Sequence, residues 1–287
     1  MSMRLVNEVA SRTDRRQTDG QGAHGAAVIG TDEMNAAGRG SSVDPQEIER
    51  FEAMAADWWN PRGSMRALHR LNPVRLRYVR DQIAGHFGRS ATALDGLKGL
   101  RLADIGCGAG LLSEPLARLG GEVVGVDMAK ANVEMARSHA ARSGLSIDYR
   151  AVAAEDLEAA GERFDVVLAM EIVEHVTDAA AFLKVCAGLV KPGGLLFVST
   201  INRTMKAYAL AIVAAEKVLR WVPRGTHDWN KFVMPGEIEE AVTPDLTELD
   251  RCGVVYNPLL DEWRLARDTD VNFMMVFSRS GEGEPQS

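Results

Sequence analysis

The sequence Leu102-Ala103-Asp104-Ile105-Gly106-Cys107-Gly108-Ala109-Gly110 is an apolar run that breaks into three glycines at alternating positions. A helix-like segment, 111–119, comes next, and a second apolar run, 123–126, ends at Asp127. Glycines between a strand and a helix let the backbone turn tightly and approach a ligand, and a carboxylate after the second strand accepts hydrogen bonds from ribose hydroxyls. The two segments therefore predict a βαβ unit that binds a nucleoside.

The glycine spacing separates two kinds of nucleoside ligand. The dinucleotide pattern G-x-G-x-x-G places a pyrophosphate at a helix N-terminus, whereas this chain has G-x-G-x-G preceded by Asp104. A carboxylate at that point repels a pyrophosphate and suits a ligand with an ammonium or sulfonium group. The pattern favours S-adenosylmethionine over NAD or FAD, and it resembles the first motif of the class I methyltransferases.

The composition is that of a soluble protein with residues for a large core. The 287 residues are 46% hydrophobic and 25% charged, and the formal net charge of -7 argues against nucleic acid as a partner. Three widely spaced cysteines show no metal-type pairing, which fits a reduced, cytoplasmic setting. We find neither a secretory signal nor the run of about 20 apolar residues that a membrane span needs.

Two domains of unequal character are expected. Residues 1–43 are rich in Gly, Ala, Ser and Asp and predict a flexible extension, and residues 44–287 form the methyltransferase domain. Its first helix starts at Asp44, with Pro45 in the first position and Glu47 completing a capping box. A second helix is expected from Asn72 as cap and Pro73 as first residue to about Ile83. These helices precede the nucleoside-binding unit and can pack over its crevice.

The rest of the chain predicts an α/β fold. We expect parallel strands over 101–105, 122–126, 147–152, 164–170 and 195–200, with helices over 129–143 and 178–190. Strand-like segments at 246–256 and 271–277 would complete the sheet as a hairpin. The expected fold is Rossmann-like, with a seven-stranded, mostly parallel sheet, a C-terminal antiparallel hairpin and N-terminal helices.

Several residues are candidates for binding the cofactor. Asp127 is placed to hold the ribose, although it could instead cap the next helix. Asp104 is expected to face the amino acid moiety, and Gly106 and Gly108 to let the backbone approach the ligand. Met170 ends the fourth strand at the crevice, where ordinary core packing is the alternative. The adenine contact lies near 153–156, through an acidic side chain or through backbone N–H groups.

The segment Glu171-Ile172-Val173-Glu174-His175 directly follows the fourth strand. If it turns helically, Glu171, Glu174 and His175 project from one side and could hold a divalent cation, with Mg²⁺ favoured by the carboxylate oxygens. Alternatively His175 serves as a general base near neutral pH. The third alternative is that these side chains form a pocket wall or helix caps.

An additional segment, 205–222, stands where a short connection would suffice. Its apolar face is flanked by cations, a pattern typical of a helix at an anionic lipid surface. A lid that packs on the protein's own core would use the same residues. The face comprises Tyr208, Ile212, Ala215 and Leu219, and the cations are Lys206, Lys217, Arg220 and Arg224.

Longer sequence blocks narrow the resemblance. From about residue 44 to 278 the chain resembles the ubiquinone-biosynthesis O-methyltransferases, which methylate polyprenyl catechol and demethylubiquinol intermediates. The blocks that carry the resemblance are F-E-A at 51–53, W-W at 58–59, L-H-R-L-N-P-V-R at 68–75, D-I-G-C-G at 104–108, M-E-I-V-E-H-V at 170–176, S-T-I-N-R at 199–203, G-T-H-D-W at 225–229 and D-V-N-F-M at 270–274. The first 43 residues lie outside it.

The resemblance implies site residues and partners. It implies cofactor contacts at Arg75, Gly106, Asp127 and Met170, and the Arg75 guanidinium can pair with the methionyl carboxylate of S-adenosylmethionine. It also implies Mg²⁺ at Glu171, Glu174 and His175. Membrane lipid contact through 202–228 would place the protein in the cytoplasm at the inner membrane, with other ubiquinone-biosynthesis enzymes as candidate partners.

The expected reaction is in-line attack of a phenolate oxygen on the sulfonium methyl group. A free phenol titrates near 10, so deprotonation by Glu174 or His175, or polarisation by Mg²⁺, favours the reaction. Two alternatives stay open at this point. The acceptor could be another phenol or isoprenoid, or the chain could be a noncatalytic cofactor-binding scaffold of a membrane-bound assembly.

Overall fold

The computed structural model describes residues 44–210, 228–257, 260 and 262–281 of the chain. By its internal contacts the chain divides into residues 1–40 and residues 41–287, and the account below concerns the second unit. Within the described ranges, no helix is both long enough and apolar enough to cross a membrane. The prediction that 1–43 is a flexible extension lies outside the described residues.

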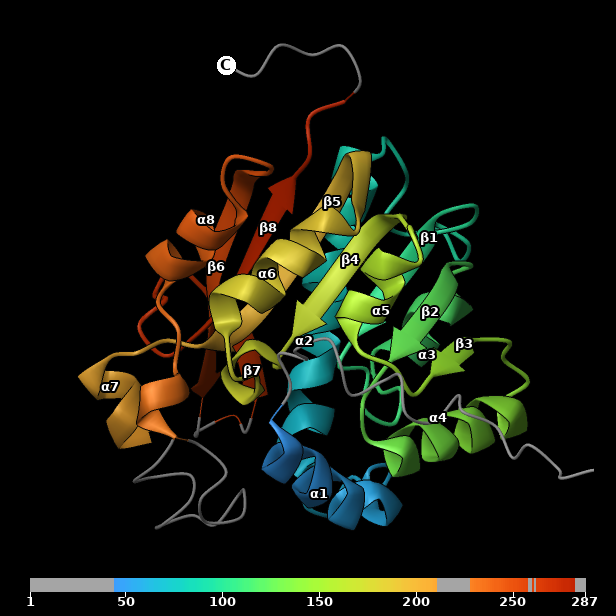
Figure 1. Ribbon diagram of the computed structural model, residues 1–287, viewed down its shortest axis with the longest axis horizontal. Helices are drawn as coiled ribbons and strands as arrows, with labels where there is room; N and C mark the ends of the chain where they lie inside the picture. The colour runs from blue at the N-terminus through green and yellow to red at the C-terminus, as the bar shows by residue number, and fades with distance from the viewer. Residues whose placement is uncertain (1–43, 211–227, 258–259, 261, 282–287) are drawn as a thin grey trace, which may run out of the picture. The chain divides into compact units, whose positions relative to one another are not determined.

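One mixed sheet forms the centre of the second unit (Figure 1). Its strands follow the order β3-β2-β1-β4-β5-β8-β6-β7, in which the first five are parallel and the last three pair antiparallel. The bounds are β1 Arg101–Ile105, β2 Glu122–Val126, β3 Asp148–Arg150, β4 Phe164–Met170, β5 Val190–Ile201, β6 Thr247–Asn257, β7 Glu262–Ala266 and β8 Asn272–Ser278. This arrangement confirms the predicted α/β fold with a mostly parallel sheet and an antiparallel C-terminal part.

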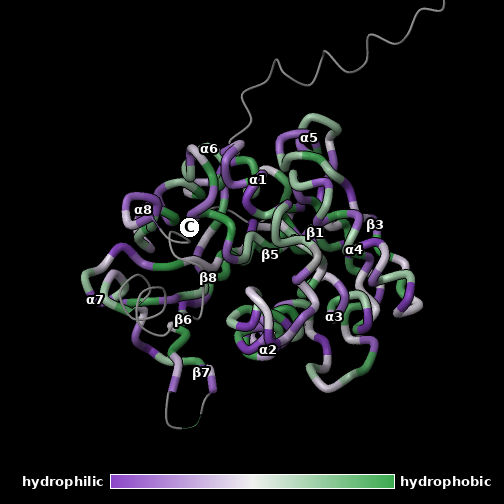
Figure 2. Tube along the Cα trace, turned by 90° about the horizontal axis from the view of Figure 1, so that it is seen from below, coloured by the Kyte–Doolittle hydropathy of each residue, from purple (hydrophilic) through white to green (hydrophobic). Residues whose placement is uncertain are grey.

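Helices cover both faces of the sheet. One apolar cluster joins α5, α6 and α8 to one face of the sheet, and a second joins α2 and α3 to the other face. Figure 2 shows the sheet between these two layers of helices. The helix bounds are α1 Pro45–Met54, η2 Ala55–Asp57, α2 Arg66–His86, α3 Ser113–Arg118, α4 Lys130–Arg142, α5 Ala154–Ala159, η3 Val173–His175, α6 Ala179–Gly188, α7 Met205–Ala207, η5 Trp229–Lys231 and α8 Pro235–Val242.

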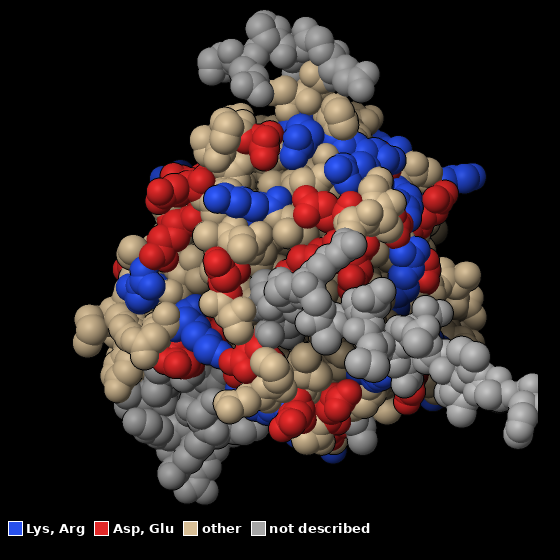
Figure 3. Space-filling model, viewed as in Figure 1, with Lys and Arg blue, Asp and Glu red and all other residues tan. Residues whose placement is uncertain are grey.

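Burial on both faces explains the near-continuous apolar strands. In β4, the neighbours Val166 and Val167 point to opposite faces and both are fully buried, Val166 with α2 and α3 and Val167 with α5 and α6. On the outside, acidic and basic side chains are mixed over the face seen in Figure 3. The strands therefore form the core, and their carboxyl ends are left to build a site.

The sheet has eight strands, where the sequence predicted seven. The additional strand is β7, which pairs with β6 at the edge of the sheet. Its residues alternate between charged and apolar types, with Glu262 and Arg264 on one side and Trp263 and Leu265 on the other. A short edge strand with charges is a common protection against strand addition, and its weak apolar signal explains why it was missed.

The start of α2 also differs from the prediction. The helix begins at Arg66 and carries Pro73 in its interior, instead of beginning at Asn72 and Pro73. The Asn72 side chain donates to the carbonyl of Leu111 (2.8 Å) and accepts from Arg75 (3.1 Å), so it does not cap the helix. Packing of Met65 and Leu71 in apolar clusters sustains the first two turns despite the proline.

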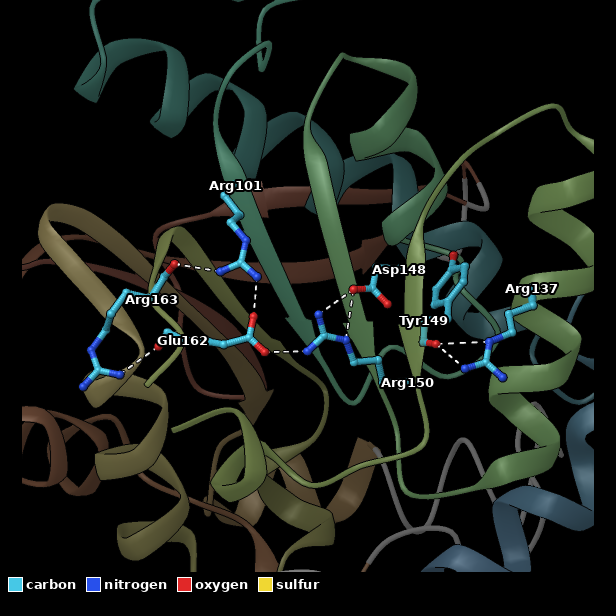
Figure 4. Close-up of polar contacts among 7 residues, drawn as sticks. All are labelled: Arg101, Arg137, Asp148, Tyr149, Arg150, Glu162 and Arg163. Carbon is cyan, nitrogen blue, oxygen red and sulfur yellow. Dashed lines mark hydrogen bonds and ion pairs between the residues drawn. The ribbon is translucent and has the colours of Figure 1, made fainter. Parts of the chain in front are cut away.

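A carboxylate away from the carboxyl ends of the strands ties three segments together (Figure 4). Glu162, between α5 and β4, forms ion pairs with Arg101 of β1 and with Arg150 of β3, the latter at 2.5 Å. Arg150 also pairs with Asp148 at 2.5 Å, and Arg101 stacks over the Phe164 ring at 4.3 Å. This network fixes the β-strands from the side that carries α5 and does not contribute to the cavity described next.

Candidate active site

A cavity of about 750 Å³ lies at the carboxyl ends of the parallel strands. This is where ligands bind in open α/β sheets, and the volume suits a small-molecule site. Its walls come from α1, α2, the glycine loop, the ends of β2 and β4, α7, and the β6–β7 hairpin. The predicted residues that line it are Arg75, Asp104, Gly106, Asp127, Met170, Glu171, Glu174 and His175. The structure therefore brings nearly all of the residues predicted from the sequence into one cavity, and Gly108 lies just beside them.

The glycine loop requires glycine at three positions, of which Gly110 has φ +86° and would place a Cβ 2.2 Å from the Tyr149 hydroxyl oxygen. Gly106 has φ +72°, and a Cβ there would stand 2.7 Å from the Ile172 side chain. Gly108 has φ +53°, and a Cβ there would stand 2.3 Å from the Trp58 ring. Since L side chains rarely adopt positive φ, all three glycines are needed for the turn and for close approach. Trp58 thus lies directly over the loop.

Trp58 and Trp59 attach the N-terminal helices to the glycine loop. The Trp58 indole donates to Asn132 of α4 at 2.9 Å, and the Trp59 indole donates to the carbonyl of Ala109 at 3.0 Å. Trp59 also stacks on His139 with ring centroids 3.4 Å apart. As predicted for the helices that precede the β-sheet, α1 and η2 cover the crevice.

Asp127 faces the same loop. Its carboxylate accepts from the backbone N–H of Gly108 and of Ala129, both at 2.9 Å, so it joins the glycine loop to the start of α4. Burial raises the pKa of Asp127, and these two N–H groups oppose the rise. The cap and the ligand contact that the sequence offered as alternatives are compatible, because each carboxylate oxygen has further lone pairs.

Asp104 is a buried acid at the end of β1. It accepts from the Ser113 hydroxyl at 2.5 Å, and burial raises the pKa of Asp104 to about 6, while Ser113 and Arg75 oppose the rise. An ammonium group placed against it would favour the ionised form. This position is the one expected for a residue that faces the amino acid part of a cofactor.

Arg75 of α2 is a buried cation among carboxylates. Burial lowers the pKa of Arg75, and Glu171, Asp104 and Glu174 oppose this effect. One terminal nitrogen donates to Asn72, whereas its Nε has no hydrogen-bond partner among the described residues. A buried donor without a partner costs about 1–3 kcal/mol, so this atom is suited to a ligand carboxylate.

Glu171 and Glu174 are each held by a hydroxyl of β5. Ser199 donates to Glu171 and Thr200 donates to Glu174, both at 2.7 Å. Glu171 has φ +57°, an uncommon conformation for a side-chain residue that points to a functional constraint. Burial raises the pKa of Glu174, and the neighbouring Glu171 adds to the rise. The segment forms a 3-10 turn, η3, instead of an α-helical turn.

His175 is bound by a residue from the other end of the domain. Its Nδ1 lies 3.0 Å from Oε2 of Glu47, and the Phe51 ring meets it edge-on at 5.1 Å. The predicted capping box is wrong at this point. Asp44 caps α1 by accepting from Gln46, while the Glu47 carboxylate contacts His175 and Arg50. The Glu47 side chain therefore faces the half-buried His175 imidazole instead of a backbone N–H at the start of α1.

The predicted magnesium ligands do not form a ligand cluster in this arrangement. In the part of the chain that the structure describes, no three His, Cys, Asp or Glu side chains are grouped so that they could hold a metal ion. Glu171, Glu174 and His175 each have a protein partner instead. The donor set therefore does not fit a metal as it stands, and we assign no step to one. The three-residue magnesium site stays a prediction.

Sequence reasoning missed the residues that hold the site in place. Glu47 was assigned to a helix cap, and Ser199 and Thr200 appeared only within a family block. Their one sequence signal was the hydroxyl pair at the end of β5, facing the segment after β4 in a parallel sheet. Near the expected adenine position, residues 152–155 line the cavity, while Asp156 caps α5 by accepting from Ala153.

The predicted membrane or lid segment is described only in part. Residues 211–227 lie outside the described residues. Of the remainder, Met205 in α7 and Leu210 after it are exposed to solvent, and Lys206 pairs with Asp270 at 3.3 Å. Lys206 and Leu210 also line the cavity, so the base of this segment borders the site.

Comparison with known proteins agrees with this geometry. Residues 103–198 match the family model described as "Methyltransferase domain". In fold, the chain is similar to the crystal structure of magnesium protoporphyrin IX methyltransferase from Synechocystis PCC 6803 with bound SAH. The TM-score is 0.56 at 18% identity, over 82% of this chain and 95% of that one. Fold and site together define a class I methyltransferase.

Closer relatives give the family. Ubiquinone biosynthesis O-methyltransferase of Sinorhizobium medicae is 56% identical over 83% of this chain and 97% of its own length. The protein of the same name from Parvibaculum lavamentivorans is 55% identical over 84% of this chain and 95% of its own length. The chain belongs to the family of the ubiquinone biosynthesis O-methyltransferases.

Proposed function

We propose that the protein transfers the methyl group of S-adenosylmethionine to a phenolic hydroxyl of a polyprenyl catechol or demethylubiquinol in ubiquinone biosynthesis. The observation that carries the proposal is the continuity of one cavity. It runs from the glycine loop and Asp127, past Glu171, Glu174 and His175, to an apolar wall. Membership of the family supports the same acceptor.

Cofactor binding is assigned to residues whose chemistry matches each part of the ligand. The Nε of Arg75 supplies a donor for the methionyl carboxylate, and Asp104 supplies an acceptor for the ammonium group. Asp127 accepts from the ribose hydroxyls, while Gly106 and Gly108 allow close approach. Met170, at the end of β4, closes the cavity beneath the transferred group.

The reaction needs a nucleophilic oxygen and two aligned reactants. S-adenosylmethionine supplies an electrophilic methyl group when bound. His175 and Glu174 line the part of the cavity in which we expect the acceptor hydroxyl to bind. An imidazole is a common general base for such a reaction. Burial raises the pKa of Glu174, which suits a group that holds a proton or accepts a hydrogen bond beside the acceptor. Positioning by the cavity walls supplies much of the remainder.

The far end of the cavity is suited to an apolar tail. Val254, Tyr256 and Trp263 line it, and they come from the β6–β7 hairpin. An isoprenoid chain gains about 25 cal/mol for each Å² of apolar surface that it buries here. A small polar phenol would not require this wall.

Membrane contact and the domain limits belong to the same proposal. A polyprenyl acceptor resides in the membrane, so peripheral contact at the inner membrane through 202–228 would bring the cavity to it, with residues 44–287 as the catalytic domain. Exposure of Met205 and Leu210 beside the cavity supports this contact. Vesicle flotation with Lys217 and Arg220 replaced by Gln tests it, and unchanged flotation would favour the lid.

The activity is tested by incubating the purified protein with S-adenosylmethionine and a short-tailed demethylubiquinol, with Mg²⁺ or with EDTA. Mass spectrometry should detect a product heavier by one methylene group. A product that forms in EDTA would place the base function on the protein, and a product that requires Mg²⁺ would restore the metal site. Binding of the cofactor without any product would contradict the proposed acceptor.

Variants connect the activity to the site. Replacing His175 or Glu174 by Ala or Gln should reduce kcat by about 100-fold or more, as expected for a lost acid–base group, while cofactor affinity stays within about twofold. Replacing the exposed Glu49 by Gln, on α1 and away from the cavity lining, is the matched control. Unchanged turnover in both site variants would contradict the assignment.

A further inference from the structure

We propose that Glu47 is a positioning residue for methyl transfer, which holds the His175 ring so that its Nε2 faces the acceptor hydroxyl. This inference rests on the proposed function. Glu47 belongs to α1, which lies 128 residues before His175 in the chain and outside the region matched by the methyltransferase-domain model. The geometry thus gives the N-terminal helix a part in the chemistry.

The contact between the two side chains is short and shielded. Oε2 of Glu47 lies 3.0 Å from Nδ1 of His175, and the side chains are 17% and 13% exposed. Phe51, one helical turn after Glu47, meets the imidazole edge-on with an interplanar angle of 86°. Two residues on one face of α1 therefore restrict the ring, one by a hydrogen bond and one by packing.

The contact selects one tautomer of the imidazole. A neutral imidazole has one N–H donor and one acceptor nitrogen, whereas a carboxylate only accepts. Nδ1 must therefore carry the hydrogen, and Nε2 keeps its lone pair. Among the described residues, the His175 ring forms a hydrogen bond with Glu47 alone, and His175 lines the cavity. Nε2 is thus the nitrogen left for a substrate.

Two cations flank the Glu47 carboxylate. Arg50 lies 3.2 Å from Oε2, and Lys231 lies 3.9 Å from Oε1. Lys231 also binds Asp44 at 2.8 Å, which fixes the start of α1 beside η5.

The proton balance of the step follows from this orientation. The acceptor O–H bond breaks and its proton moves to Nε2, while the oxygen forms a bond to the methyl carbon and the sulfonium C–S bond breaks. The products are the methyl ether, S-adenosylhomocysteine and an imidazolium whose Nδ1–H still faces Glu47. The carboxylate stabilises the imidazolium, as the aspartate does in serine hydrolases. The proton then leaves to solvent.

The kinetic test compares Glu47→Gln with Glu49→Gln on the same helix, using the full chain. Glu47→Gln keeps the size of the side chain but presents an amide that can also donate, so the ring loses its defined tautomer. We expect kcat to fall about 10- to 100-fold with KM for both substrates within about twofold, and Glu47→Asp to recover part of the loss. Glu49→Gln should behave as wild type, because this side chain is exposed.

A spectroscopic test separates orientation from stability. In ¹⁵N-histidine-labelled protein, the His175 signals, assigned by their loss in His175→Gln, should show a protonated Nδ1 and a lone pair on Nε2. Glu47→Gln should shift them toward a mixture of tautomers at an unchanged melting temperature. Wild-type signals together with wild-type kcat in Glu47→Gln would overturn the inference. If the wild type binds the cofactor but forms no ether, the proposed function fails, while the tautomer signals still decide the orientation.

Discussion

At the scale of single residues, Asp104 is an ionisable group whose burial has a measurable consequence. Burial raises the pKa of Asp104 to about 6, above its value in an unfolded chain. The folded state therefore binds a proton more tightly between pH 4 and pH 6. The contribution of this residue to stability is highest below pH 4 and falls as the pH rises to 6.

The variant Asp104→Asn should remove this pH dependence. At roughly 1.4 kcal/mol per pKa unit, the free energy of unfolding of the variant should rise by about 2 kcal/mol relative to that of the wild type between pH 4 and pH 7. Urea unfolding at several pH values measures the difference. A constant difference across this range would show that Asp104 titrates as an exposed acid does. The same variant should weaken cofactor binding if Asp104 contacts the ammonium group.

Glycine is required at position 108 for two reasons, its positive φ and its close approach to Trp58, and a pair of variants can distinguish them. Gly108→Ala should destabilise the protein both by its positive φ, at about 1–2 kcal/mol, and by collision of the new Cβ with Trp58. Gly144→Ala is the control, because Gly144 has φ +68° and no atom within 4 Å of a Cβ. We expect the control to lose only the backbone contribution. Equal decreases in the free energy of unfolding of the two variants would mean that the Trp58 ring can move aside without loss of stability.

The positions of site residues were predictable from sequence where a motif encodes them locally. Asp104 lies near the end of β1, and Gly106 and Asp127 directly follow β1 and β2, so their place in a parallel sheet fixes where they lie. Glu47 carries no such signal, since its partner lies 128 residues away and the choice between a cap and an imidazole is decided by tertiary packing. The conformation of Glu171 was likewise not readable, because a positive φ at glutamate follows from no propensity.

At the scale of elements, α2 includes a proline that its own geometry opposes. Pro73 lies seven residues after the first residue of the helix, where it removes one backbone hydrogen bond at a cost of about 3 kcal/mol. Pro73→Ala should therefore stabilise the protein by about 2 kcal/mol after the added freedom of the unfolded chain is counted. Pro45→Ala, at the first position of α1, is the control and should not stabilise it. Melting curves of both variants give the comparison.

Element boundaries were the least predictable part of the fold. The five parallel strands were predictable because burial on both faces produces continuous apolar runs. The start of α2 was not, since a proline after asparagine is a strong local start signal and only the packing of Met65 and Leu71 overrides it. Strand β7 was not, because an exposed edge strand needs few apolar residues.

At the scale of the whole molecule, the cavity joins the first helices to the C-terminal hairpin, so tail recognition should depend on residues far from the glycine loop. Trp263→Ala should raise KM about 10-fold for an acceptor with two isoprene units and leave KM for a tail-less catechol within about twofold. Trp263 lies against Tyr256 at 5.4 Å between ring centroids. Leu94→Ala, at an exposed position outside the cavity lining, is the control. Equal changes for both acceptors would place the tail elsewhere.

The position of β8 has a consequence for synthesis on the ribosome. Although β8 follows all other described strands in the chain, it lies inside the sheet, between β5 and β6. Until it emerges, the nascent β6–β7 hairpin has no bonded neighbour in the sheet, and the far edge of β5 has open N–H and C=O groups. A chain that stalls before residue 272 would thus offer two unpaired edges to chaperones or to aggregation, and the enzyme becomes complete only with its final strand.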